Sequence, residues 1–140
     1  MKKDTLITAL TALLLSVLSA SCTHNNGDIG KIFGKWKLTY IEATDTEKPE
    51  TGGTMFWSFQ SSTVFVQIND GSHDEIGSYG NFRLADETLF LDFADTDYPN
   101  LIPGTERQSE WQLLELTGKK MTLRLQGHDK GYTVWHFTKW

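Results

Sequence analysis

The sequence predicts an all-β fold, namely an eight-stranded antiparallel up-and-down barrel, with a two-sheet β-sandwich as the alternative. Three observations lead to this prediction. Eight segments alternate apolar and polar residues with the period of two that is typical of half-buried strands. Most links between them are short enough for hairpins and contain turn residues. No internal segment has the apolar spacing of an amphipathic helix, and only residues 28–33 could form a helical turn.

The first three predicted strands each carry an apolar stripe on one face. They cover residues 35–40, 54–60 and 64–68, and the third ends at Asn69-Asp70-Gly71, a strong turn signal. The stripes consist of Trp36, Leu38 and Tyr40, then Met55, Trp57 and Phe59, then Val64, Val66 and Ile68. We expect each stripe to face the interior, because side chains two residues apart in a strand share a face.

Five further strands follow in the second half of the chain. They are predicted at residues 76–84, 88–93, 109–116, 121–126 and 132–139. Short polar segments that contain Asp, Gly or Lys separate most of them and suit hairpin turns.

The lengths of the links favour the barrel over the sandwich. Strands that cross between two sheets need long connections, and only residues 43–53 and 94–107 could serve. Sequential hairpins instead close a barrel whose interior is filled or holds one small ligand. The length of 140 residues suits one such domain, predicted at 31–140.

The first 21 residues are predicted to be a signal peptide. Lys2 and Lys3 precede an apolar segment from Leu6 to Leu18, which is shorter than the ~20 residues of a transmembrane helix. Cys22 follows directly and is the only cysteine, so no internal disulfide can form. Residues 22–30 are polar and rich in Gly and Asn, and are predicted to be a flexible tether.

Residues 18–22 resemble a bacterial lipobox. The resemblance implies that Cys22 is acylated and that the acyl chains attach the protein to a membrane. Ser19 stands where an aliphatic residue is usual, a departure that looser lipoboxes of Bacteroides-type bacteria tolerate. The alternative is an ordinary cleavage site beside a coincidental cysteine. The resemblance implies a lipid anchor in the bacterial cell envelope, at the outer membrane rather than the inner one. The side that the domain faces stays open, because no acidic run follows Cys22.

Gly34-Lys35-Trp36, at the start of the first strand, resembles the Gly-x-Trp signature of lipocalins. The segments FGKWKLTYIEA, GGTMFWSFQ, SYGNFRL with LFLDF, and VWHFTKW make residues 30–140 similar to lipocalin-like lipoproteins of Bacteroides-type bacteria. The resemblance implies that Gly34 and Trp36 are structural and that Trp36 closes the barrel base. Lipocalins usually pack an Arg from the last strand on this Trp. Here that region offers only Lys139, with Arg124 one strand earlier, so a different partner is expected.

Several function classes lack support in the sequence. The net charge of −5 and the scattered basic residues argue against a nucleic-acid partner. The histidines have no metal-binding spacing, and the acids near Asp92 lack the glycine turn and terminal Glu of a calcium loop. No nucleophile motif is present. The histidines are His24, His73, His128 and His136, and the acids are Asp92, Asp95, Asp97 and Glu106. We therefore expect that the protein is not an enzyme, has no catalytic residue and binds no cofactor or metal.

The aromatic residues are the remaining candidates for a binding site. The chain has five Trp, eight Phe and four Tyr. Four of them alternate with polar neighbours and are predicted to line a cavity for a small apolar ligand: Trp57, Phe59, Trp111 and Trp135. The alternative is that aromatic side chains fill the core. The protein would then be a non-catalytic accessory or protein-interaction module with a filled barrel.

Overall fold

The computed structural model describes residues 30–72, 75–93 and 101–140. They form eight strands and no helix, so within this part of the chain nothing helical is long and apolar enough to span a membrane. The strands are β1 (Gly34–Thr44), β2 (Thr54–Gln60), β3 (Thr63–Asn69), β4 (Ile76–Ala85), β5 (Thr88–Asp92), β6 (Gln108–Leu116), β7 (Lys120–Gln126) and β8 (Tyr132–Lys139). The predicted signal peptide, Cys22 and nearly all of the predicted tether lie outside the described residues.

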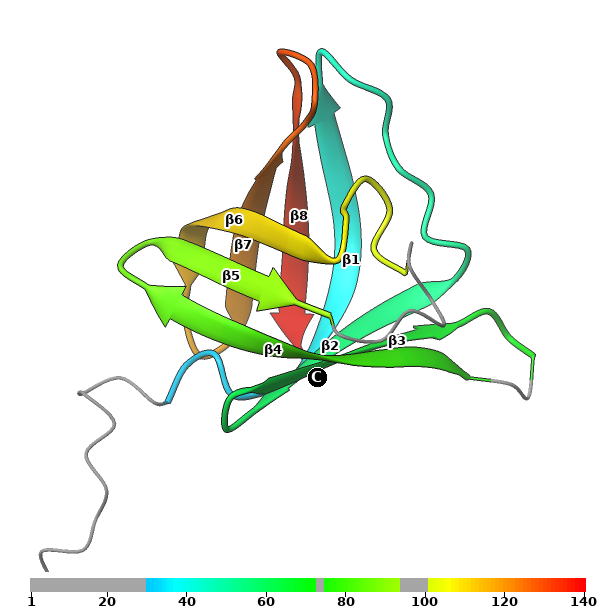
Figure 1. Ribbon diagram of the computed structural model, residues 1–140. Coiled ribbons are helices and arrows are strands. Elements are labelled where there is room, and N and C mark those ends of the chain that lie inside the picture. Colours follow the sequence, from blue (N-terminus) through cyan, green and yellow to red (C-terminus); the bar gives the residue numbers. More distant parts are fainter. Residues whose placement is uncertain (1–29, 73–74, 94–100) are drawn as a thin grey trace, which may run out of the picture.

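Each strand pairs with the next one in sequence, and β8 pairs with β1 to close the barrel (Figure 1). Every pairing is antiparallel. The two long links join β1 to β2 and β5 to β6, which are neighbours, so neither link crosses between sheets. The predicted up-and-down barrel is confirmed, and the sandwich alternative is wrong.

One predicted inward residue, Tyr40, points outward. The pairing of β1 with β8 shifts register between Leu38 and Tyr40, which marks a β-bulge at Thr39. An extra residue reverses the alternation of faces beyond it. Trp36 therefore faces the interior, whereas Tyr40 is 52% exposed and Ile41 takes the buried position.

The turn after β3 has the local hydrogen bonds that its sequence predicts. The Asn69 side-chain oxygen accepts from the Gly71 N–H at 2.9 Å, and an Asp70 carboxylate oxygen accepts from the Ser72 N–H at 2.8 Å. Gly71 has a φ of +87°, which a side chain would disfavour. Hydrogen bonds from the Ser72 side chain and backbone lower the pKa of Asp70.

The core is formed by the inward side chains of the strands, with one addition from a loop. The largest fully buried residues are aromatic, headed by Trp36, Trp57, Trp111 and Trp135. Ile102, in the link before β6, is only 3% exposed and belongs to the same core cluster. The described end of that link therefore folds back onto the barrel.

Candidate functional site

The four aromatic residues predicted to contact a ligand all lie inside the barrel. Trp57 on β2, Trp111 on β6 and Trp135 on β8 have no exposed surface, and Phe59 is 2% exposed. Trp111 meets both Trp57 and Trp135 edge to face, with ring centroids 5.3 Å apart in each pair. β2 and β6 are on opposite sides of the closed sheet, so the contact between Trp57 and Trp111 spans the interior. At this level the described side chains fill the space between the walls.

The indole N–H groups of these three tryptophans have partners within the protein. Each N–H donates to the side chain two residues earlier on the same face of its own strand. The acceptors are Met55 Sδ for Trp57 (3.1 Å), Ser109 Oγ for Trp111 (2.9 Å) and Thr133 Oγ1 for Trp135 (2.8 Å). Ligand contact by these residues remains a prediction, and it would have to use the ring surfaces.

Among the described side chains, Ser78 Oγ is a buried polar atom without a hydrogen-bond partner. Ser78 lies on β4, is 2% exposed and pairs with Val66, a core residue of β3. An unsatisfied buried hydroxyl costs roughly 1–3 kcal/mol. Within the described interior, Ser78 is therefore the side chain with a free hydrogen-bonding group.

The base of the barrel is closed by Trp36. Its side chain is fully buried, and its indole N–H donates to the Ile32 carbonyl at 2.7 Å. The ammonium group of Lys139 lies 4.3 Å from the centre of the Trp36 ring, in cation–π geometry. It also donates to the carbonyl groups of Lys31 and Phe33. Lys139 thus packs on Trp36 in the position where lipocalins usually have an Arg.

Gly34 makes room for this lysine. Its φ is +110°, and a Cβ built on it would lie 3.0 Å from Lys139 Cε. Partial burial lowers the pKa of Lys139 from the usual value for lysine. These contacts agree with the Gly-x-Trp resemblance, and the structural role of Gly34 and Trp36 stays a prediction.

A cleft opens between β1 and β2 above this base. β1 pairs with β2 only through Gly34–Lys37, opposite Phe56–Phe59. Beyond the bulge at Thr39, β1 continues beside β8, whereas β2 continues beside β3 (Figure 1). The space between them has a volume of about 830 Å³, and residues 48–51 of the β1–β2 link form its far side.

The floor of this cleft belongs to the core. Ile41 and Met55 are 5% and 1% exposed, and both line the cleft. Met55 is also the residue that accepts the Trp57 indole hydrogen bond, so the floor of the cleft is in direct contact with a central tryptophan. Leu38 and Pro49 add apolar surface, while the rim is polar. The polar lining consists of Lys37, Thr39, Lys48, Glu50, Thr51 and Thr54.

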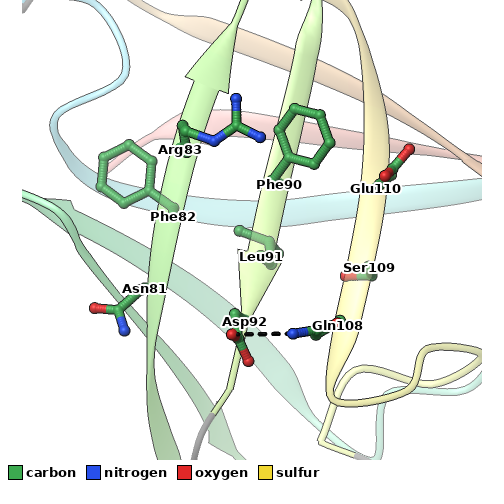
Figure 2. Close-up of a pocket in the computed structure, with 9 residues that line it drawn as sticks. All are labelled: Asn81, Phe82, Arg83, Phe90, Leu91, Asp92, Gln108, Ser109 and Glu110. Carbon is green, nitrogen blue, oxygen red and sulfur yellow. Dashed lines mark hydrogen bonds between the residues drawn. The ribbon is translucent and has the colours of Figure 1, made fainter.

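A second, smaller hollow lies on the outer face of β4, β5 and β6 (Figure 2). It has a volume of about 430 Å³. The Arg83 guanidinium lies 4.0 Å from the centre of the Phe90 ring and covers it. Asp92 accepts from Gln108 at 3.2 Å and pairs with Arg107 at 3.3 Å. Several of the polar side chains that line this hollow are therefore already paired within the protein, and Phe82, Phe90 and Leu91 give it apolar surface as well.

Comparison with known proteins agrees with this architecture. The model of the lipocalin-like domain family matches residues 13–137. The chain belongs to the lipocalin-like domain family. The predicted resemblance is therefore confirmed, and the family's barrel is generally a binding fold rather than a catalytic one. No curated protein is similar enough to this chain to count as a relative.

Two crystal structures share the fold of this lipocalin-like chain. One is an uncharacterized protein from Bacteroides eggerthii, 21% identical, with a TM-score of 0.61 over 78% of this chain and 99% of that one. The other is a lipocalin-like protein from Bacteroides uniformis, 17% identical, with a TM-score of 0.58 over 78% and 98% of the two chains. At these identities the likeness shows the fold alone.

The structure places the remaining chemical candidates apart from one another. His136 points away from Trp135 and Phe137, stacks on Tyr40 with ring centroids 4.0 Å apart, and contacts a Glu42 carboxylate oxygen at 2.7 Å. Among the described residues, no group of His, Cys, Asp and Glu could hold a metal ion. His24, His73, Asp95 and Asp97 lie outside the described residues.

Sequence reasoning missed the cleft residues Leu38, Ile41, Pro49 and Met55. The alternation of β2 predicts Met55 inside the barrel, but the position of Met55 beside an opening depends on where β1 and β2 separate. The signal that could have indicated it is the length of the 43–53 link, because a tight hairpin would have held the two strands together.

Proposed function

We propose that this lipocalin-like protein binds a small, mainly apolar molecule in the cleft between β1 and β2. The observation that carries the proposal is that the two strands separate beyond Lys37, leaving about 830 Å³ above a floor of core residues. Ligand sites typically occupy about 300–1,000 Å³ and combine apolar surface with a few polar groups. The cleft has a volume within this range, and its apolar floor and polar rim supply both kinds of surface in similar amounts.

The lining suggests how the ligand is oriented. Ile41 and Met55 would contact its apolar body, because they form the buried floor. Lys48 and the rim threonines would contact a polar end, since they line the cleft at its opening. A long-chain carboxylic acid has this chemistry. Trp57, two positions after Met55 on β2, is then a second layer behind the ligand.

We further propose that the protein is held in the bacterial cell envelope by acyl chains on Cys22. The support comes from the sequence: a signal-like segment, a lipobox-like stretch and a single cysteine directly after it. Two or more acyl chains give stable anchoring, since each buried CH₂ contributes about 0.8 kcal/mol. The proposed role is non-catalytic and involves no metal or cofactor.

Titration with a fluorescent fatty acid tests the binding proposal. We expect micromolar affinity, equivalent to about 8 kcal/mol. Ile41→Ala should weaken binding about tenfold, because it removes floor contacts in the cleft. Leu125→Ala is the matched control: Leu125 is 8% exposed, belongs to the same core and does not line the cleft. It should lower stability without changing affinity.

The competing location is the barrel interior, through Trp57, Phe59, Trp111 and Trp135. If Trp135→Ala weakens binding while Ile41→Ala does not, the ligand lies inside the barrel and the cleft proposal is wrong. Failure of a panel of fatty acids, sterols and haem-like compounds to bind the folded protein would favour the accessory or protein-interaction module. The observation that favours this second function is the contact of Trp57 with Trp111 across the interior, because it indicates a filled barrel.

A further inference from the structure

The base of the barrel carries a cluster of lysines beside an exposed tryptophan. We name Lys35, Lys37, Lys119, Lys120 and Trp140 the basal patch. Lys119 and Lys120 are exposed, Lys35 and Lys37 are half-buried, and Trp140 is 68% exposed. None of these lysines forms an ion pair with another described residue. Their charges are therefore available to a partner.

The sheet brings the patch together from three adjacent strands. Thr138 on β8 pairs with Lys37 on β1 and with Lys120 on β7, so both lysines flank the same outward position. The Trp140 N–H donates to the Lys35 carbonyl at 2.8 Å, which fixes the end of the chain against β1. Lys119 accepts a backbone hydrogen bond from Lys139.

Trp140 is positioned by contacts with its neighbours but remains exposed to solvent. Lys37 Nζ lies 4.7 Å from the centre of the Trp140 ring, and Lys35 Nζ lies 4.4 Å from that of Phe56. Phe56 and Trp140 meet edge to face at 5.4 Å. A tryptophan flanked by lysines suits the boundary between lipid headgroups and water, where one part of the ring is apolar and the N–H is hydrated.

Charge is distributed unequally between the two ends of the molecule. In an up-and-down barrel, the links after β1, β3, β5 and β7 share the end opposite the base. Acids outnumber bases among the described residues of these links. The acids are Asp45, Glu47, Glu50, Asp70, Glu75, Glu106 and Asp129, and the bases are Lys48, Arg107 and Lys130. An anionic surface would therefore attract the base and repel the opposite end.

The described chain also begins at the base. Lys31 and Phe33, just before β1, accept hydrogen bonds from the Lys139 ammonium group, so residues 30–33 lie at the base. Cys22 lies eight residues earlier, a separation that spans at most about 28 Å. If Cys22 is acylated, as proposed above, the base is the end that the anchor keeps near the membrane.

We propose that the basal patch docks the barrel onto an anionic lipid surface, with Trp140 at the headgroup level and the acidic end pointing away. This orientation rests in part on the proposed anchor, whereas the affinity of the patch for anionic lipid does not. Negative charges near the base oppose docking, namely Glu115, Asp86 and Glu87 on neighbouring elements. The four lysines of the basal patch, together with Lys139, outnumber these three acids.

Vesicle co-sedimentation tests the patch without the anchor. The protein is the chain from residue 22 with Cys22→Ala, which keeps all eight strands and the described core. We expect binding to phosphatidylcholine vesicles that contain about 30% phosphatidylglycerol, little binding to phosphatidylcholine alone, and loss of binding in high salt. Each lysine of the patch changed to Gln should weaken binding about fivefold. The matched control, Lys130→Gln at the opposite end, should not weaken it.

Tryptophan fluorescence provides a second readout. The other four tryptophans are fully buried, so brominated lipids should quench emission from Trp140 and Trp140→Phe should abolish the quenching. If the lysine-to-Gln variants of the basal patch bound anionic vesicles as well as the control variant does, the proposal would be overturned. Tight binding to soluble heparin without lipid quenching would also overturn it, by assigning the patch to a different polyanion. Because the chain carries no acyl group and the assay no fatty-acid ligand, failure here is distinguishable from failure of the proposed anchor or cleft.

Discussion

At the scale of single residues, the base of the barrel depends on Gly34, Trp36 and Lys139. Gly34 has no side chain, which leaves space for Lys139. The Lys139 ammonium group lies over the Trp36 ring, and the Trp36 indole N–H donates a hydrogen bond to the Ile32 carbonyl. Removing the ring would leave a cavity and two polar partners without their contacts. We therefore expect Trp36 to contribute strongly to the stability of the fold.

We predict that Trp36→Ala lowers the free energy of unfolding by about 3–5 kcal/mol, the usual cost of deleting a buried aromatic side chain. Urea denaturation followed by circular dichroism measures it. Trp140→Ala is the matched control, because Trp140 is 68% exposed and should change stability by less than about 0.5 kcal/mol. A similar midpoint for both variants would show that Trp36 does not close the core.

At the scale of elements, β1 determines where the barrel is open. Its bulge at Thr39 turns Tyr40 outward and Ile41 inward. Its first residues pair on both edges, whereas beyond Lys37 it pairs only with β8. The amides of this second half that face the cleft therefore have no strand partner among the described residues.

Hydrogen exchange should reveal this asymmetry. We predict that alternate amides between Leu38 and Thr44 exchange much faster than those of β7, which is paired on both edges. Exchange measured by NMR resolves the individual amides. A fatty acid bound in the cleft should slow the fast ones. Uniform protection along β1 would mean that β2 follows it further than the pairing described above.

The sequence predicts the strands well because their signal is local. Alternation and turn residues indicate all eight strands, and the inward positions of Trp57, Phe59, Trp111 and Trp135 follow from the same period of two. The alternation predicts the wrong face for Tyr40, because a bulge depends on the pairing of β1 with β8, a strand distant in the sequence. The cleft was missed for a similar reason, since strand separation is a property of the closed sheet.

At the scale of the whole molecule, the proposed anchor and ligand site belong to different parts of the chain. We predict that Cys22→Ser moves the protein out of the membrane fraction and abolishes metabolic labelling with a fatty-acid analogue, because the variant lacks the thiol that is acylated. Cell fractionation and labelling in the native host measure both effects. Fractionation and labelling that match the natural chain would contradict acylation at this residue.

The two methionines beyond the first residue provide the most direct test of the cleft. Met55 lines the cleft, whereas Met121, buried at the start of β7, does not. In NMR spectra of protein labelled with ¹³C at the methionine methyl groups, titration with a long-chain fatty acid should shift the Met55 resonance and leave Met121 unchanged. A shift of Met121 alone, or of neither methyl group at saturating ligand, would contradict binding between β1 and β2.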